Sequence, residues 1–320
     1  MAENTETVKG HSLWRDAWRR LLKNKLAVFG LVVMVIMVVA VTIGPAIIRW
    51  TTGYTADYIP SEGGLIKSFP PSLDHPMGTD EAGRDMLARV LQGGRISLMV
   101  GVISTIVSLI VGVSYGAIAG YLGGKIDNLM MRLVDIIYAI PYILIVIVLL
   151  SVFSGQNTPK WIQALSNTFG GAGNQGLSQI FLLFFALGLV SWLTMARVVR
   201  GQILSLKNQE FVMAARATGV STPNIIFRHL VPNVLGPVII YATLTVPSVM
   251  LTEAFLSFLG LGVQAPYASW GSLASDGIKN IAIYPWQLIF PGVTMALTLF
   301  SLNFLGDGLR DALDPQTRKF

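Results

Sequence analysis

Six long runs without a charged residue divide the chain. They cover residues 26–48, 96–124, 136–154, 177–196, 230–252 and 281–306. About twenty helical residues, each rising about 1.5 Å, are enough to cross a hydrocarbon core of about 30 Å. The pattern therefore predicts an all-α polytopic membrane protein with six transmembrane helices.

The segments between the runs suggest how the chain is organised. Residues 1–25 form a basic N-terminal segment, and its amphipathic part, 14–25, is typical of a helix that lies against anionic headgroups. Residues 49–95 should form a polar extracytoplasmic loop, in which 78–98 is expected to be a helix resting on the outer surface. The remaining parts are the first transmembrane helix at 26–48, a five-helix core at 96–306 with a loop at 205–233, and a tail at 307–320.

Glycines and prolines mark particular runs. The second run contains Gly112, Gly116 and Gly120, which is typical of closely packed membrane helices. A proline lies in each of the third, fifth and sixth runs and should bend or break the helix, which is tolerated where the helix lines a cavity. These prolines are Pro141, Pro247 and Pro291.

Composition and charge place the chain in a membrane and orient it. It is 53% hydrophobic and 12% charged, with a mean hydropathy of +0.62. Of its 23 lysines and arginines, sixteen lie on the side of the termini and seven on the other. The positive-inside rule therefore predicts that both termini and the 205–233 loop are cytoplasmic. The net charge of +6 does not indicate nucleic-acid binding, because the basic residues cluster at the ends of the runs.

The sequence carries no sign of catalytic or metal chemistry. The absence of cysteine excludes disulfides and thiolate chemistry, and the three histidines, His11, His75 and His229, are far apart. It contains no catalytic dyad, nucleophile elbow or phosphate-binding glycine loop. We expect a non-catalytic chain that binds no metal and does not hydrolyse ATP itself.

The positions of the acidic residues separate two classes of transporter. Carriers driven by protons or sodium usually keep an ionisable residue at mid-membrane, but the middle of every run here is uncharged. Asp135 follows Arg132 by three positions and should pair with it. Glu253, near the outer end of the fifth run, is interpreted as an interfacial or helix-packing carboxylate, or alternatively as a pathway-lining group.

The polar stretch 210–233 predicts two short amphipathic helices joined at Gly219, a residue that readily takes the left-handed conformation that ends a helix. We expect Ala215 to be small because a partner protein packs over it. The alternative to such a contact surface is a segment that merely lies on the bilayer surface. The first helix should carry four residues on one shared face: Phe211, Ala214, Ala215 and Thr218.

The second short helix has its own start and stop signals. Thr222 should be its N-cap, with Pro223 at the first helical position and Pro232 ending the run. Its apolar stripe should consist of Ile226, Phe227, Leu230 and Val231.

The order of residues in this stretch resembles the EAA loop of ABC importer permeases. Ala-Ala-Arg-Ala-x-Gly at 214–219 is followed by Arg-His-x-x-Pro-Asn at 228–233. Where the motif begins with glutamate this chain has Met213, and Glu210 lies nearly one turn earlier. Further similar stretches are GTDEAGRDMLARVLQGGRISL at 78–98, LSFLGLG at 256–262, SWG at 269–271 and NFLGDGLRDALDP at 303–315.

Together these stretches resemble the oligopeptide and dipeptide permease family, and most of all its C-type oligopeptide subunits. The resemblance implies a bacterial inner-membrane subunit that works with a second homologous permease, two cytoplasmic ATPases and an extracytoplasmic peptide-binding protein. It implies ATP and Mg²⁺ on the ATPases and no cofactor on this chain. The ATPase-coupling residues it implies are Glu210, Ala214, Ala215, Arg216, Gly219, Arg228, His229 and Pro232.

Two alternatives stay open. By the same resemblance the substrate could be a dipeptide, a nickel chelate or glutathione in place of an oligopeptide. A stand-alone secondary transporter is disfavoured, because no internal repeat is visible and the large helical loop at 205–233 has no purpose in one. A membrane-embedded enzyme is poorer still.

Overall fold

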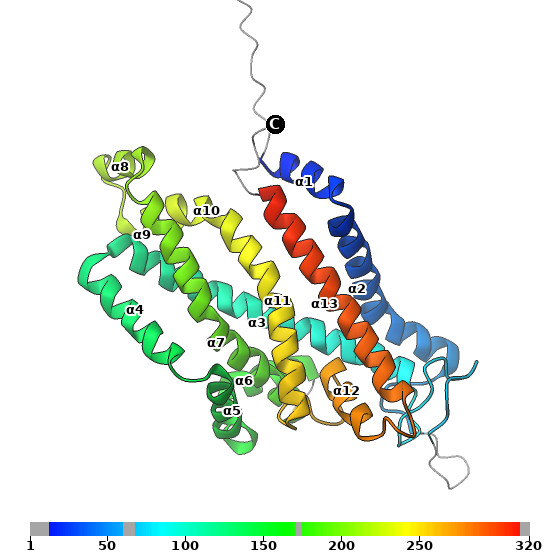
Figure 1. Cartoon of the computed structure of the whole chain (residues 1–320). Coiled ribbons are helices and arrows are strands. Elements are labelled where there is room, and N and C mark those ends of the chain that lie inside the picture. Colours follow the sequence, from blue (N-terminus) through cyan, green and yellow to red (C-terminus); the bar gives the residue numbers. More distant parts are fainter. Residues whose placement is uncertain (1–12, 60–67, 171–174, 314–320) are drawn as a thin grey trace, which may run out of the picture.

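The computed structural model describes residues 13–59, 68–170 and 175–313, and these ranges are helical apart from turns and loops (Figure 1). Within them no strand forms, and Thr79 and Asp85 make the one isolated bridge. The all-α prediction is therefore confirmed. In chain order the elements are α1 (Leu13–Lys23), α2 (Lys25–Thr52), α3 (Met86–Leu122), α4 (Gly124–Tyr138), α5 (Tyr142–Phe153), the 3₁₀ turn η1 (Gly155–Asn157), α6 (Lys160–Gly170), α7 (Gln175–Leu206), α8 (Glu210–Ala217), α9 (Thr222–Asn224), the π-helical turn η2 (Ile225–Leu230), α10 (Val231–Asn233), α11 (Leu235–Phe258), α12 (Trp270–Lys279) and α13 (Trp286–Leu313).

Five single helices in the described ranges are long and apolar enough to cross a membrane: α2, α3, α7, α11 and α13. The pair α4 and α5 passes the same test together but is bent by 83° at its junction. Counting this pair as one broken span gives six crossings, the number that the sequence predicts. Helix α8, helix α1 and the C-terminal end of α13 lie at one end of the bundle, and α5 and α12 lie at the other (Figure 1).

The second span differs from its prediction. Helix α3 begins at Met86, ten residues before the uncharged run, so the expected surface helix at 78–98 is wrong. Asp85 caps the helix by accepting a hydrogen bond of 2.8 Å from the Ala88 amide. Met86 and Val90 are each only 1% exposed, because this first part of α3 packs into the protein. The polar connection between α2 and α3 is accordingly shorter than predicted.

Only one of the three marked prolines breaks its helix. Pro141 lies in the junction between α4 and α5, as predicted. Pro247 and Pro291 lie inside the continuous helices α11 and α13, so of the predicted bend or break these two positions show no break. Both rings are buried, and membrane helices tolerate a proline whose freed backbone groups find neighbours within the protein.

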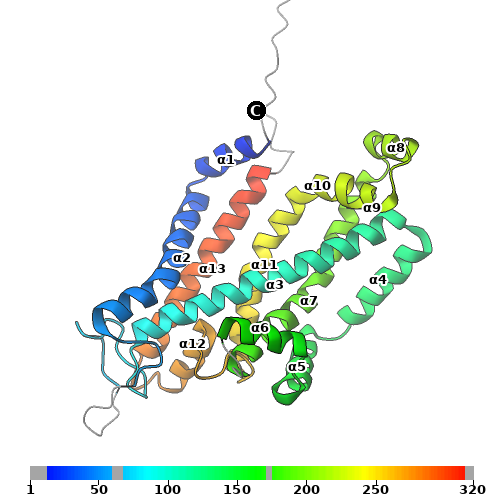
Figure 2. The same ribbon diagram turned by 180° about the vertical axis from the view of Figure 1, so that it is seen from behind.

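The glycines of α3 allow it to approach α7 closely. A Cβ at Gly116 would collide with the Ala196 carbonyl oxygen on α7, and one at Gly112 would lie 2.7 Å from the Met195 Cβ. Gly188 on α7 makes a similar close approach to α3, since a Cβ there would lie 2.8 Å from the Ser104 carbonyl oxygen. Figure 2 shows α3 running the length of the molecule beside α7. The close packing predicted for the second run is confirmed.

Helix α1 packs against the end of α13. Ala17 and Leu21 are buried there together with Ala27 and Ala312. The apolar stripe of this basic helix therefore contacts the protein itself, while Arg19 on its other side stays exposed. This contact places the described N-terminal helix beside the C-terminal end of the last span.

Candidate functional site

The segment 205–233, called here the coupling segment, rests on the ends of two spans. Val212 on α8 is fully buried and Ala215 is 8% exposed. Both belong to one apolar cluster with Ile225 and Leu230 from η2. The cluster also includes Ala117 of α3 and Val199 and Ile203 of α7. The two short helices are therefore joined to the membrane helices by a continuous core.

Gly219 ends α8 in the predicted way. Its φ is +77°, in the left-handed region. The Gly219 amide donates to the Arg216 carbonyl at 3.0 Å, and the Val220 amide donates to the Ala215 carbonyl at 3.1 Å. These two bonds make a Schellman motif, in which glycine is favoured because a Cβ is unfavourable at positive φ. The joint between the helices thus has one defined geometry.

The second half of the coupling segment differs in two details. Ser221, one residue before the expected Thr222, is the N-cap, and Pro223 is at the second helical position. Pro232 does not stop the run, because the π-helical turn η2 precedes it and Pro232 occupies the second position of the next α-turn. A proline is tolerated there because its missing N–H has no partner to lose. The chain continues almost directly into α11.

The structure splits the four residues that were predicted to share one face of α8. Phe211, Ala214 and Thr218 are exposed, whereas the buried stripe consists of Val212 and Ala215. The expectation that a partner packs over Ala215 is therefore wrong, because this side chain faces the protein's own core. Of the other predicted coupling residues, Glu210, Arg216, Gly219, Arg228 and Pro232 are exposed and His229 is partly exposed.

Arg216 ties α8 to the end of α3. Its Nε donates to the Tyr121 hydroxyl at 3.2 Å, and its guanidinium lies 4.9 Å from the centre of the Tyr121 ring. A cation over an aromatic face adds a modest attraction, about 0.5–1 kcal/mol at an exposed site. Arg216 is therefore a positioning residue for the coupling segment as well as an exposed one.

A cavity of about 480 Å³ lies between the bent pair α4–α5 and helices α7 and α11. None of its lining residues is charged, and eight carry a hydroxyl group. The sequence pointed to this place only through Pro141, whose helix break forms part of the lining. The hydroxyl residues are Tyr138, Tyr142, Ser191, Thr194, Tyr241, Thr245, Ser248 and Thr252. We call this cavity the groove.

Glu253 does not line the groove. It is 1% exposed, and its carboxylate accepts hydrogen bonds from Ser257 at 2.7 Å and from Ser269 at 2.6 Å. Ser269 caps α12 and Ser257 is on α11, so the carboxylate joins these two helices. The helix-packing interpretation of Glu253 is confirmed.

Two ion pairs hold α4 against α7. Asp135 pairs with Arg197 at 2.7 Å, so the predicted partner, Arg132, is wrong. Asp127 accepts two hydrogen bonds from Arg200, one of them at 2.7 Å. Arg197 also lies 4.2 Å from the centre of the Tyr138 ring at the end of α4. Sequence reasoning missed these partners because they are more than sixty residues apart.

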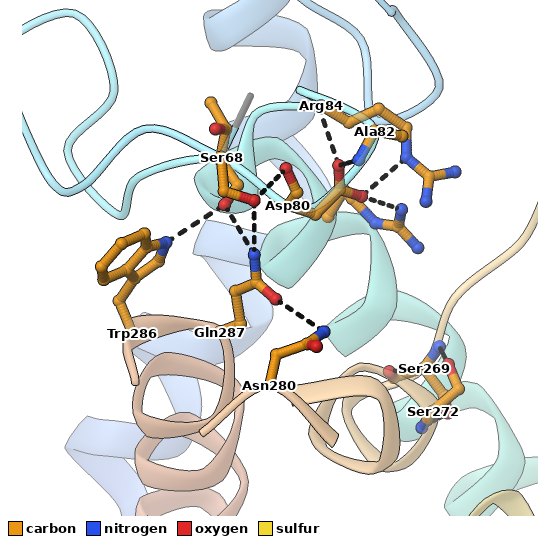
Figure 3. A network of polar contacts seen from close by, with 11 residues as sticks. Ser68, Asp80, Ala82, Arg84, Ser269, Ser272, Asn280, Trp286 and Gln287 are labelled. Atoms are coloured by element: carbon orange, nitrogen blue, oxygen red, sulfur yellow. Dashed lines mark hydrogen bonds and ion pairs between the residues drawn. The ribbon is translucent and has the colours of Figure 1, made fainter. Parts of the chain in front are cut away.

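A polar network at the end of the bundle opposite α8 holds the connection between α2 and α3 in place (Figure 3). The Asp80 carboxylate accepts from the Ala82 and Arg84 amides at 2.9 Å and also binds the Arg84 and Arg89 guanidiniums. Gln287 on α13 donates to the Thr79 carbonyl at 3.1 Å. Arg89 is thereby neutralised near the start of α3, which explains how this charge lies inside the protein.

The described ranges contain no group of three or more histidine or acidic side chains placed to hold a metal ion. His75 instead contacts Asp85 at 2.9 Å, just before α3. His11 and the predicted end of the C-terminal motif at Pro315 lie outside the described residues.

Comparison with known proteins gives two family matches. The family described as "Binding-protein-dependent transport system inner membrane component" matches residues 112–319. The "N-terminal TM domain of oligopeptide transport permease C" matches residues 12–61. The first match contains the whole coupling segment and the groove.

Similar curated proteins extend over nearly the whole chain. The oligopeptide transport system permease protein OppC of Escherichia coli K12 is 48% identical over 97% of this chain and 94% of that protein. The protein of the same name from Haemophilus influenzae is 46% identical over 97% and 91%. The dipeptide transport system permease protein DppC of Bacillus subtilis is 43% identical over 98% and 90%.

A solved structure shares the fold. The chain in an inward-facing conformation of the MetNI methionine ABC transporter matches with a TM-score of 0.50 and 17% identity. The match covers 72% of this chain and 98% of that one.

Proposed function

The chain belongs to the family of binding-protein-dependent transport system inner membrane components, and we propose that it carries oligopeptides inward as the permease subunit of an ATP-driven importer. Membership makes it a membrane subunit of an ABC transporter and not a catalytic enzyme. The oligopeptide substrate is supported by relatives at 46–48% identity that carry this function in their names. The proposal that the coupling segment transmits movement from the ATPases is supported by the apolar core that α8, η2, α3 and α7 share.

This core supplies a route for mechanical coupling. A protein that grips α8 and η2 moves a body that is packed on α7 and continues into α11. Both α7 and α11 line the groove, so a displacement of the coupling segment changes the groove. Packed elements transmit such shifts because well-packed interiors do not deform continuously. We propose that the exposed residues Glu210, Ala214, Arg228 and Pro232 contact the ATPase. Ala215 and Gly219 would maintain the shape of the coupling segment.

The family implies an ATPase and a substrate-binding protein as partners. We propose in addition a second homologous permease and two ATPase subunits, with ATP and Mg²⁺ bound by the ATPases. The proposed location is the inner membrane of a bacterium, with both termini and the coupling segment in the cytoplasm. Helix α1, the described end of α13 and the coupling segment lie at one end of the bundle, which supports placing them on the same side of the membrane (Figure 1).

The proposed division of the chain follows the two family matches. Residues 12–61 match one family and 112–319 the other, which supports a separate first helix and a core of five spans. A dipeptide is the second candidate substrate, favoured by the similarity to the Bacillus subtilis dipeptide permease. Nickel chelates and glutathione stay as weaker alternatives, and a stand-alone carrier is weaker again.

Purification tests the proposed function. The tagged chain, expressed with its genetic neighbours and extracted in mild detergent, should retain ATPase subunits. In liposomes with the binding protein, the complex should accumulate a labelled tetrapeptide only when ATP is supplied. Peptide uptake by the chain alone, driven by a proton or sodium gradient, would show a secondary transporter instead.

Orientation can be tested with single cysteines, since the native chain has none. Ser72 and Ser221 are both exposed and belong to opposite ends of the bundle. A membrane-impermeant maleimide should label Ser72→Cys in intact spheroplasts and label Ser221→Cys only after the membrane is opened. The opposite pattern would reverse the orientation, and labelling of both in sealed cells would contradict the number of crossings.

A further inference from the structure

Resting on the proposed function, we propose that the groove between α4–α5, α7 and α11 binds the main chain of the transported peptide. This assigns a substrate site to a place where the sequence indicated none. Its volume of about 480 Å³ lies within the range of about 300–1,000 Å³ that is usual for ligand pockets.

The position of the groove is that of a transport pathway. Ser191 and Ser248 lie near the midpoints of α7 and α11, so the groove is at the middle level of the spans. The break at Pro141 exposes backbone at this level, which is tolerated only where it is enclosed by protein or lines a cavity. Broken helices of this kind mark substrate sites in other transporter folds.

The lining chemistry matches a peptide main chain. Each peptide amide loses water at this depth, and an unpaired amide in an apolar medium is costly. A hydroxyl group can donate to a carbonyl and accept from an N–H, so it suits either group of the main chain. Because the lining carries no charge, it offers no ion-pair partner to a peptide side chain of either sign.

Two hydroxyl pairs stand on either side of the helix break. Tyr138, the last residue of α4, shares a hydrogen bond of 2.8 Å with Thr194 on α7. Tyr142, the first residue of α5, shares one of 2.6 Å with Thr252 on α11. Both tyrosines line the groove, and each is more than two-fifths exposed. A peptide main chain would take over these hydrogen bonds and tie together the four elements that line the groove.

A bulky residue in the groove tests this site. Ser248→Trp should lower uptake of radiolabelled tetra-alanine about tenfold or more, since overfilling a fitted site is unfavourable. The variant complex should still retain its ATPase subunits. The matched control is Leu251→Trp, on the same helix but outside the groove lining, which should leave uptake within about twofold of the wild type. Uptake within about twofold for Ser248→Trp would overturn the proposal.

Photocrosslinking tests directly whether the transported peptide contacts the groove. Tyr142 replaced by p-benzoylphenylalanine should crosslink to labelled tetra-alanine during ATP-driven uptake, and excess unlabelled peptide should suppress the product. The same group at Ile36, exposed on α2 and remote from the groove, should not. Crosslinks from position 142 only to lipid or only to another permease subunit would overturn the site. A wild-type chain that retains no ATPase would instead contradict the proposed function.

Discussion

Ala214→Glu is expected to abolish ATP-driven uptake while the permease still inserts in normal amount. Ala214 is exposed on α8, one residue from the buried Ala215. If α8 docks against an ATPase, a carboxylate at this small position must enter a packed contact, which costs several kcal/mol through clash and desolvation. The affinity should fall by about a hundredfold or more, because each 1.4 kcal/mol is a factor of about ten. The measurement is the amount of ATPase subunit that co-purifies, together with tetrapeptide uptake.

Two neighbouring substitutions make this result interpretable. Asn208→Glu adds the same charge in the exposed turn just before α8 and should be tolerated. Ala215→Glu places the charge inside the chain's own core and should lower the amount of folded permease. Full retention of ATPase by Ala214→Glu would show that the exposed face of α8 is not the docking surface.

Gly116→Leu is expected to prevent folding of the permease. A Cβ at this position meets the Ala196 carbonyl, which is helix backbone and cannot move aside as a side chain could. The two helices would have to separate, which would also open the neighbouring contacts of Gly112 and Gly120 with α7. Overpacking alone costs about 1–3 kcal/mol, and loss of the shared interface adds to it. The checks are the amount of protein in the membrane and the melting temperature in detergent.

Gly201→Leu is the matched control on α7. This glycine also lies within a helix, but a Cβ there meets nothing within 4 Å. Replacing a helical glycine in open space should leave stability unchanged or raise it by about 0.5–1 kcal/mol. Equal yield and stability of the two variants would show that the contact between α3 and α7 does not depend on a glycine at 116.

The sequence was sufficient where the deciding interactions are local. Gly219 illustrates this, because the left-handed conformation and the Schellman hydrogen bonds involve only residues within five positions of one another. Its neighbours show the opposite. Ala214 and Ala215 are the same residue type in the same helix, and only the position of α3 and α7 beneath α8 decides that Ala215 is buried.

The sequence alone indicated the number of crossings and the fold class, because a helix that crosses lipid satisfies its own backbone hydrogen bonds and needs a long apolar run. The family was recognised from its motifs, chiefly the one at 214–233. The glycines of the second span also predicted close helix packing, but they did not indicate which helix would be the neighbour. Only the tertiary structure paired Asp135 with Arg197, placed Glu253 between α11 and α12, and brought eight hydroxyl residues into one groove. Such contacts join positions far apart in the chain, and apolar periodicity carries no information about which helices become neighbours.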